Sequence, residues 1–379
     1  MSSRTARKPT AAGAAAEPPS IETLRARMDE INLKILRLVS LRASLAVEIG
    51  RLKHNNGGEV YQPVRELAII EKMIAENQGP LTDEQVKRIY VEIISACRAL
   101  EHEPRVAFLG PEHTYSHEAA RMRFGSSVEL MPLESFAAVF QAIENGRADF
   151  GVVPVENSTE GSVTLTLDLL IDTALVIIGE ILLPVRPSIM SLSGKREAVT
   201  RIIAHQQLLA QCRGYLSANF PNCETEAVAS NGLAAQRAAA DGSLAAIASA
   251  AAGEAYGLRT IASNVQDLAT NMTRFIVMGT RPVERSGPGR ADKTTLLFAV
   301  ADRVGTLNQA LNLFARNAIN ISKIESRPIR ARPWEYLFFV DVMGHRDDPK
   351  LARAIKSLER KALFLKVLGS YPEGRSAAA

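Results

Sequence analysis

The sequence has little of three features that mark whole classes of protein. Its three cysteines, Cys97, Cys212 and Cys223, lack the spacing of metal ligands, and an odd number without a secretory signal is typical of a reducing cytosol. No apolar run approaches the roughly 18 residues of a membrane span. The net charge is only +4, which favours anionic small molecules over nucleic acid as ligands. We therefore expect a cytoplasmic protein that has no metal or cofactor and binds neither membrane nor nucleic acid.

Several regions of different composition follow one another along the chain. Residues 1–20 are rich in Ala, Pro and Ser and have no apolar h-region, which predicts a disordered tail rather than a signal peptide. Residues 21–103 have only helical patterns, whereas residues 104–281 alternate short apolar strands with helices, as an α/β domain does. A Pro/Gly/Arg-rich linker is expected over residues 282–293. Residues 294–372 then show the strand–helix–strand–strand–helix–strand order of a ferredoxin-like α+β domain.

The first predicted helix, from Ile21 to Lys53, carries an apolar seam with heptad spacing. The apolar members of this seam are Leu24, Met28, Ile31, Ile35, Leu38, Leu45, Ile49 and Leu52. Arg42 also lies in the seam, where a desolvated guanidinium needs an anionic partner. The helix would be roughly 48 Å long, too long to be covered by so few other helical residues. The pattern therefore predicts a partner chain.

The cations on this helix indicate a ligand cavity. Lys53 follows Arg42 on nearly the same helix face, roughly 16 Å away. Arg25 lies about 25 Å from Arg42 and roughly 100° round the helix. A pocket that uses Arg42 and Lys53 must therefore take its Arg25 from a second chain. A purely structural ion pair at Arg42 is the alternative.

Three segments of the helical region carry a family resemblance. LRARMDEINLKILRLVSLRASLAVEIGRLK, YQPVRE and SACRALE resemble the all-helical chorismate mutases. The resemblance implies an intertwined dimer whose active sites hold the two carboxylates of chorismate. The residues it implies for this site are Arg25 of the partner subunit, Arg42 and Arg65 for the carboxylates, Lys53 for the ether oxygen, Glu66 for the hydroxyl, and Gln62, Cys97 and Glu101 around them. A pericyclic rearrangement needs this kind of holding and charge stabilisation, and no nucleophile.

Three of these positions depart from the best-known bacterial pattern. Gln62 stands where an Asp is common, Cys97 replaces a Ser and Glu101 replaces a Gln. Glu101 must be protonated to donate to an ether oxygen. Burial raises the pKa of a carboxyl, whereas Lys53 and the arginines lower it, so the sequence leaves this protonation open. A solvated residue at a helix end is the alternative for Glu101.

Four segments of the α/β region resemble prephenate dehydratase: FLGPEHTYSHEAA, GVVPVENSTEG, AHQQLLAQC and NMTRF. The resemblance implies a two-lobed fold like that of periplasmic binding proteins, with the ligand between strand-end loops. It implies that Thr273 donates to the departing hydroxyl. The prephenate-binding residues that we expect are Thr114, Ser116, Asn157, Ser158, Thr159, Gln207, Thr273 and Arg274. Because a threonine hydroxyl is a poor acid, Arg274 or a water should assist Thr273.

Departures from the dehydratase pattern keep other functions open. His113 takes the place of a turn glycine, where a positive φ would be strained, and would otherwise put an imidazole at the pocket mouth. Ala204 replaces a Ser, and Arg186-Pro187-Ser188 replaces a stretch that often carries His. An active mutase fused to a domain with altered prephenate chemistry, or with only a metabolite-sensing role, is the alternative.

The last region resembles the ACT regulatory domain, which binds phenylalanine between paired modules. Its segments DRVGTL and ESRP carry this match, and Gly305 allows the turn to approach a ligand whose carboxylate the helix N-terminus attracts. The phenylalanine site that the resemblance implies consists of Gly305, Thr306, Leu307, Glu325, Ser326, Arg327 and Pro328. Val304 and Thr306 depart from the usual Pro-Gly-Ala-Leu, so a dimerisation module without ligand is the alternative.

Together these segments identify the chain as a member of the bifunctional chorismate mutase/prephenate dehydratase family. Such an enzyme converts chorismate to prephenate and prephenate to phenylpyruvate in phenylalanine biosynthesis, with phenylalanine as the expected effector. We expect a homodimer or a higher homo-oligomer.

Overall fold

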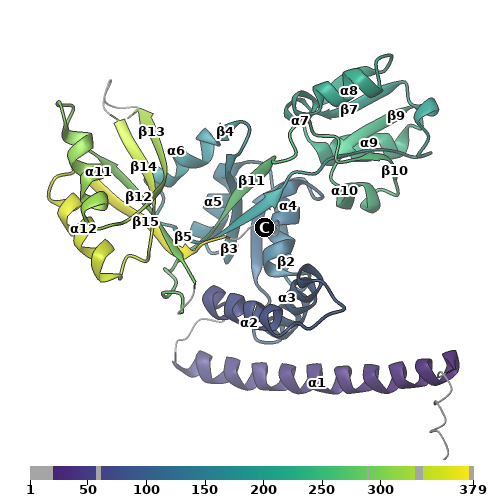
Figure 1. Cartoon of the computed structure of the whole chain (residues 1–379), viewed down its shortest axis with the longest axis horizontal. Coiled ribbons are helices and arrows are strands. Elements are labelled where there is room, and N and C mark those ends of the chain that lie inside the picture. The colour runs from purple at the N-terminus through teal and green to yellow at the C-terminus, as the bar shows by residue number, and fades with distance from the viewer. Residues whose placement is uncertain (1–19, 57–60, 288–289, 329–335, 375–379) are drawn as a thin grey trace, which may run out of the picture.

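The computed structural model describes residues 20–56, 61–287, 290–328 and 336–374. The tail predicted at residues 1–20 lies outside this part except for Ser20. Figure 1 shows a helical domain below a two-lobed α/β domain, with the C-terminal sheet and its helices at one side. This arrangement confirms the predicted fold class. In the described part of the chain, none of the helices combines the length and hydrophobicity that a membrane span requires.

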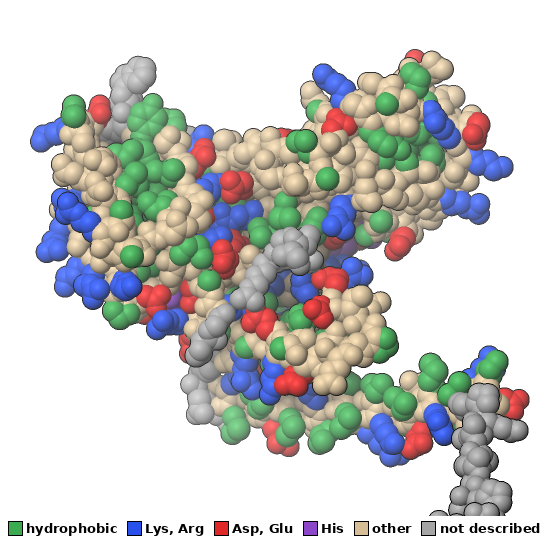
Figure 2. Space-filling view, in the orientation of Figure 1, with side chains coloured by type: hydrophobic (Ala, Val, Ile, Leu, Met, Phe, Trp, Pro, Cys, Tyr) green, Lys and Arg blue, Asp and Glu red, His purple; other side chains and the backbone are tan. Residues whose placement is uncertain are grey.

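The helical domain consists of α1 (Ile21–Asn56), α2 (Pro63–Ala75) and α3 (Asp83–Ala99). Thr82 begins α3 with a capping box, because its hydroxyl accepts from the backbone N–H of Gln85 and the Gln85 side chain accepts from the Thr82 N–H. The eight apolar seam residues of α1 are 47% to 67% exposed in the single chain. Hydrophobic side chains accordingly stand uncovered along α1 (Figure 2). An exposed apolar surface of this size indicates an interface with another protein surface.

The first lobe of the α/β domain is built on a mixed sheet with the order β2-β1-β3-β11-β5, and β4 pairs with β3. Its strands are β1 (Arg105–Leu109), β2 (Glu129–Leu133), β3 (Phe150–Asn157), β4 (Gly161–Ser162), β5 (Val176–Pro184) and β11 (Met272–Gly279). Its helices are α4 (Tyr115–Phe124), α5 (Phe136–Glu144) and α6 (Thr164–Asp172). The strands β1 and β3 run parallel, so the loops that follow them leave the sheet at the same edge.

The second lobe has the strand order β10-β6-β9-β7-β8. Its strands are β6 (Ser188–Ser191), β7 (Arg201–His205), β8 (Glu224–Val228), β9 (Leu244–Ala248) and β10 (Arg259–Ser263). Its helices are the short η1 (Arg196–Ala198), α7 (Gln206–Gln211), α8 (Arg213–Asn219), α9 (Asn231–Ala240) and α10 (Ala250–Ala255). The chain enters this lobe after β5 and returns into β11, and these two strands are paired. The two lobes are therefore joined at one place, beside the start of β11 (Figure 1).

The C-terminal domain has the predicted order of elements and an antiparallel sheet with the order β13-β14-β12-β15. Its elements are β12 (Asp292–Ala299), α11 (Thr306–Arg316), β13 (Ile321–Pro328), β14 (Tyr336–Met343), α12 (Pro349–Glu359) and β15 (Phe364–Pro372). The strand β12 thus begins inside the residues predicted as a linker. One face of the sheet packs under α11 and α12. The other face shares a hydrophobic core with the first lobe, in which Leu297 and Phe339 join Ile177 and Met278.

Candidate active sites

The end of α1 and the residues after α3 bring two predicted site residues together. The Lys53 Nζ lies 4.0 Å from Oε2 of Glu101, whose side chain is only 9% exposed. Gly50 permits this approach, because a Cβ there would lie 2.8 Å from the Glu101 Cγ. Burial raises the pKa of the Glu101 carboxyl, and the opposing charge of Lys53 does not offset it. The direction of this shift favours the protonated acid that a hydrogen bond to an ether oxygen needs.

Glu66 is held by a residue that the sequence analysis did not single out. Nη1 of Arg98 donates to both Glu66 carboxylate oxygens, at 2.7 and 2.9 Å. Nη2 of the same side chain donates to the Phe124 carbonyl oxygen at 2.7 Å. Arg98 is only 4% exposed, so it joins α2, α3 and the end of α4 in a buried contact. No sequence signal pairs Arg98 with Glu66, because the two residues lie on different helices.

The remaining residues expected in this site are only partly assembled in the single chain. Cys97 is buried on α3, while Gln62 and Arg65 are exposed at the start of α2. Arg42 is half-buried in the middle of α1. Arg25 is exposed near the other end of α1, and 28 residues of helix put it roughly 42 Å from Lys53. One chain therefore cannot bring Arg25 to the Lys53 end of its own helix.

In the α/β domain, Asn157 at the end of β3 holds the hydroxyl of Thr273 at the start of β11. The Asn157 Nδ2 donates to Oγ1 of Thr273 and to Oδ1 of Asn271, both at 3.0 Å. The Asn157 Oδ1 accepts from the N–H of Thr159 at 2.9 Å and from its hydroxyl at 2.6 Å. The structure thus brings three predicted residues, Asn157, Thr159 and Thr273, into one polar cluster, which we name the Thr273 cluster.

The second lobe closes onto this cluster through α7. Glu160 accepts hydrogen bonds from Nε2 of Gln207 and from Nε2 of Gln211, the latter at 2.7 Å. Asn271 donates from Nδ2 to Oε1 of Gln211 at 2.8 Å. Gln207 was expected here, whereas Glu160, Gln211 and Asn271 were not singled out, although they stand within or beside the quoted segments. The Ser158 hydroxyl accepts from the Met272 N–H at 2.9 Å and thereby helps to fix the turn.

The loop between β1 and α4 has the strained conformation that the sequence predicted for His113. Its φ is +63°, in the left-handed region that a non-glycine residue rarely adopts. The His113 N–H donates to Nδ1 of His117 at 2.8 Å, and burial together with His113 lowers the pKa of His117. Thr114 caps α4, its hydroxyl donates to the Pro111 carbonyl oxygen at 3.1 Å, and Ser116 is buried behind it. The imidazoles of His113 and His117 therefore stand together at this loop, with ring centroids 5.4 Å apart.

A cavity of about 1080 Å³ opens beside this loop, between the two lobes and α3. Its lining includes His113, Thr114 and Leu183. Leu183 is the β5 register partner of Thr273, but none of the described residues that line the cavity belongs to the Thr273 cluster. Arg186 contributes a cation to the wall, and α3 of the helical domain contributes Lys87. The cavity is large enough for a small dianion. Among the described residues no group of three or more His, Cys, Asp or Glu side chains could hold a metal ion.

In the C-terminal domain the predicted ligand residues lie on several surfaces. Gly305 has a φ of +83° directly before α11, and the Thr306 hydroxyl donates to the Ala301 carbonyl oxygen at 2.6 Å. Leu307 packs against the core under the helices. Glu325 and Arg327 face the first lobe, where Glu325 accepts from the Ser162 hydroxyl at 3.0 Å and Arg327 donates to Asp168 at 2.8 Å. Ser326 and Pro328, which alternate with them on β13, are exposed.

Comparison with known proteins identifies all three domains. Sequence models match for chorismate mutase type II over residues 24–102, prephenate dehydratase over residues 106–283 and the ACT domain over residues 294–360. The bifunctional chorismate mutase/prephenate dehydratase of Aquifex aeolicus is 41% identical over 357 residues, which is 93% of this chain and 98% of the relative. The chain belongs to the bifunctional chorismate mutase/prephenate dehydratase family. Both predicted activities and the ACT domain are thereby confirmed.

Two solved structures resemble the dehydratase and ACT part of the chain. A prephenate dehydratase from Arthrobacter aurescens in complex with L-Phe has a TM-score of 0.64 and 31% identity, and the match covers 71% of this chain and 90% of that one. A protein described as a quorum-quenching acylase has the same TM-score and identity, with 71% of this chain and 97% of that chain covered. The fold of this part therefore occurs in proteins described by different activities.

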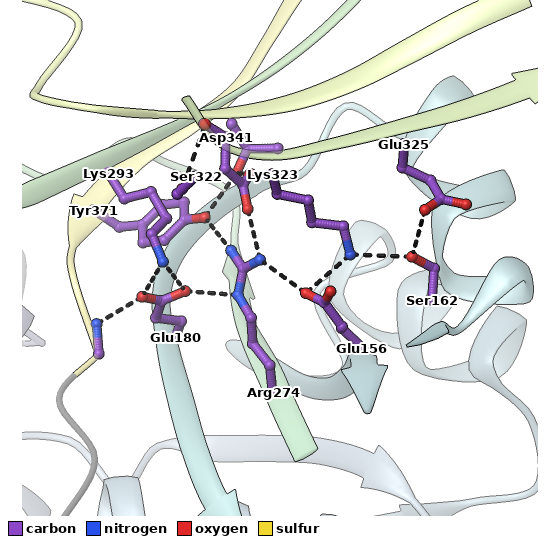
Figure 3. A network of polar contacts seen from close by, with 12 residues as sticks. Glu156, Ser162, Glu180, Arg274, Lys293, Ser322, Lys323, Glu325, Asp341 and Tyr371 are labelled. Carbon is purple, nitrogen blue, oxygen red and sulfur yellow. Dashed lines mark hydrogen bonds and ion pairs between the residues drawn. The ribbon is translucent and has the colours of Figure 1, made fainter. Parts of the chain in front are cut away.

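Arg274 does not belong to the Thr273 cluster, contrary to the prediction that it binds prephenate. Its Nε donates to Glu180 at 2.7 Å, Nη1 donates to Asp341 at 2.6 Å and Nη2 donates to the Tyr371 hydroxyl at 3.0 Å (Figure 3). These partners lie between the dehydratase and ACT domains. The physical reason is the alternation of a strand, which points neighbouring side chains to opposite faces of the sheet. Arg274 cannot therefore assist the Thr273 hydroxyl directly.

Proposed function

We propose that the helical domain rearranges chorismate to prephenate within an intertwined homodimer. The uncovered seam of α1 supplies the dimer contact, and a second α1 would bring a second Arg25 to the Lys53 end of the helix. The proposed roles are carboxylate binding by Arg25 of the partner subunit, Arg42 and Arg65, donation to the ether oxygen by Lys53 and Glu101, acceptance from the substrate hydroxyl by Glu66, and wall positions for Gln62 and Cys97.

This assignment fits the electronic demand of the rearrangement. One C–O bond breaks while one C–C bond forms, and the ether oxygen gains negative charge on the way. The half-buried pair of Lys53 and Glu101 supplies donors for that oxygen, provided that Glu101 is protonated, as the raised pKa favours. The arginines hold the substrate in its compact conformer, which lowers the entropic part of the barrier.

In the dehydratase domain, Thr273 assists the departure of the ring hydroxyl of prephenate. The C–C bond to the ring carboxylate breaks, its electron pair forms the new ring double bond, and the ring C–O bond breaks. Hydroxide leaves, takes up a proton and becomes water, while CO2 and phenylpyruvate are the other products. The observation that carries this role is the Asn157 amide, which donates to the Thr273 oxygen. Because that oxygen is the acceptor, the Thr273 hydrogen is free to point at the leaving oxygen.

The substrate carboxylates need cations other than Arg274. Arg186 lines the cavity between the lobes, and Lys87 enters its wall from the mutase domain. Both side chains can balance the two negative charges of prephenate. Polar contacts to the substrate are proposed for Thr114, Ser116, Asn157, Ser158, Thr159 and Gln207.

We also propose that phenylalanine binds the ACT domain and inhibits the dehydratase of a cytoplasmic enzyme. The support is the ACT sequence match and the L-Phe complex of the Arthrobacter aurescens protein. Gly305 leaves the turn before α11 open to a ligand. The residues proposed for the site are Gly305, Thr306, Leu307, Glu325, Ser326, Arg327 and Pro328.

Product analysis tests the whole assignment. The full chain is supplied with chorismate, and the products are separated by chromatography. We expect prephenate as a transient species and phenylpyruvate as the final product. A different compound formed from prephenate would indicate altered chemistry at the Thr273 cluster, and prephenate that is bound but never consumed would leave the domain a sensing role.

A further inference from the structure

The strands β3 and β11 present two neighbouring residue pairs to opposite faces of the first-lobe sheet. Asn157 and Thr273 are register partners, and so are the residues beside them, Glu156 and Arg274. The first pair belongs to the Thr273 cluster. Because side chains alternate along a strand, the second pair points away from it, towards the ACT domain (Figure 3).

The ACT domain holds this second pair through two oppositely charged side chains. Asp341 on β14 accepts from Nη1 of Arg274 at 2.6 Å, and Lys323 on β13 lies 2.9 Å from the Glu156 carboxylate. The two members of the pair are themselves 3.6 Å apart. Arg274 and Lys323 are each 12% exposed and Asp341 is 5% exposed, whereas Glu156 is 35% exposed, so loss of one partner changes the charge balance of a largely desolvated network.

A second contact runs from the same ACT strand to the turn of the Thr273 cluster. The Lys323 Nζ donates to the Ser162 hydroxyl at 3.1 Å, and that hydroxyl donates to Glu325 at 3.0 Å. Ser162 lies on β4, which pairs with β3 and directly follows the turn that contains Thr159. The strand β13 therefore contacts both segments that position the Asn157 side chain.

We propose that Arg274 and Glu156 are positioning residues for Thr273 and Asn157, and that Lys323 and Asp341 of the ACT domain set where they lie. The inference rests on the proposed role of Thr273 in the dehydratase reaction. A small displacement of the second pair moves the first, because each strand is continuous through both. A misplacement of about 1 Å at reacting groups can cost about a hundredfold in rate. A ligand that shifts β13 can thus slow the dehydratase without entering its cleft.

The first test separates this coupling from ordinary domain packing. Lys323→Met removes the cation that touches Glu156 and Ser162. Lys366→Met is the matched control, since Lys366 also joins the two domains, through the carbonyl oxygens of Leu170 and Ile171 at 3.1 and 3.0 Å. Dehydratase turnover is measured in the full chain with and without saturating phenylalanine, and phenylalanine binding is measured by calorimetry.

We expect the wild type and Lys366→Met to be inhibited alike. Lys323→Met should bind phenylalanine with little change in affinity. The factor by which saturating phenylalanine lowers its dehydratase turnover should be about tenfold smaller than in the wild type, and Lys323→Arg should restore the wild-type factor. Equal inhibition in Lys323→Met and the wild type would overturn the proposal, and so would loss of phenylalanine binding, which would place Lys323 in the ligand site. A wild type that forms phenylpyruvate but ignores phenylalanine would overturn it as well, whereas absence of phenylpyruvate would remove the proposed function itself.

The second test examines the positioning role. Arg274→Lys keeps a cation beside Glu180 and Asp341. It loses the planar guanidinium, which donates to both carboxylates and to the Tyr371 hydroxyl at the same time. We expect kcat for prephenate to fall about tenfold or more while KM changes little, because the side chain does not reach the cleft. A raised KM at unchanged kcat would show that Arg274 binds substrate and would contradict the inference.

Discussion

The single hydrogen bond from Asn157 to Thr273 decides what the dehydratase threonine can do. As an acceptor from the amide, the Thr273 oxygen is oriented, and its own hydrogen is available for the proposed donation to the leaving oxygen. The sequence motifs singled out both residues and placed Arg274 with them, whereas the Arg274 side chain bonds to Glu180 and Asp341 on the ACT side. Side chains alternate between the two faces of a strand, so neighbouring residues such as Thr273 and Arg274 are expected to point to opposite faces. A sequence motif can therefore predict which residues lie at a site without predicting which way each side chain points.

The protonation of Glu101 leads to a pH prediction for the mutase. Burial raises the pKa of this carboxyl, so the proton is present below that pKa and is lost as pH rises through it. Mutase kcat/KM should accordingly fall with rising pH, and Glu101→Gln, which always carries N–H donors, should flatten the profile. Stopped-time assays of chorismate loss from about pH 5 to about pH 9 measure both profiles. A flat wild-type profile would contradict the role of the acid.

At the scale of elements, α3 joins the mutase to the dehydratase. Arg98 holds Glu66 and the end of α4, while Tyr61 packs against Phe124 and Phe150 with ring centroids 5.1 and 4.6 Å apart. Glu66, the proposed acceptor of the substrate hydroxyl, is thus anchored on the neighbouring domain through Arg98.

Removal of this anchor should impair the mutase. In Arg98→Met the Glu66 carboxylate loses both hydrogen bonds from the guanidinium, and a misplaced acceptor should lower mutase kcat/KM by about a hundredfold. Glu92→Gln is the matched control, because Glu92 also lies on α3 and accepts from the Ser126 N–H of the first lobe at 3.1 Å but does not touch Glu66. Equal mutase activity in the two variants would refute the positioning role of Arg98.

The elements that the sequence predicts are those with a strong apolar pattern. The helices expected over residues 21–103 and the alternation of strands and helices expected over residues 104–281 are both present. The strands β2, β8 and β10 were missed at the edges of their sheets, and β8 and β10 are largely solvated with few apolar residues. The buried strand β6 was also missed, because it is only four residues long. The Glu66–Arg98 ion pair was missed because it depends on how two helices pack.

At the scale of the whole molecule, one continuous chain connects two active sites and a regulatory domain through shared cores. The ACT sheet buries one face against the dehydratase, and the mutase docks on the other side of the same lobe (Figure 1). Among the described elements, α1 alone extends away from these contacts with an uncovered apolar seam.

The predicted dimer can be tested by mixing inactive chains. Arg25→Ala and Arg42→Ala should each abolish mutase activity. In a heterodimer, one site combines the intact Arg42 of one chain with the intact Arg25 of the other, and the second site lacks both. Mixing should therefore restore up to about half of the wild-type mutase activity per heterodimer. Subunit exchange is monitored by native mass spectrometry with one chain isotopically labelled. Demonstrated exchange without recovery would show that both arginines act within one chain.

The central claim, that two separate sites act in series and Thr273 serves the second, is tested most directly with Thr273→Ala supplied with chorismate. Loss of the only hydrogen-bond donor assigned to the leaving oxygen should slow phenylpyruvate formation by about a hundredfold or more. Prephenate should then accumulate at the wild-type rate of the mutase, since the mutase residues are untouched, and Thr273→Ser should keep most of the second activity. Phenylpyruvate formation within tenfold of the wild type would contradict the account and would direct attention to His113 at the cavity wall.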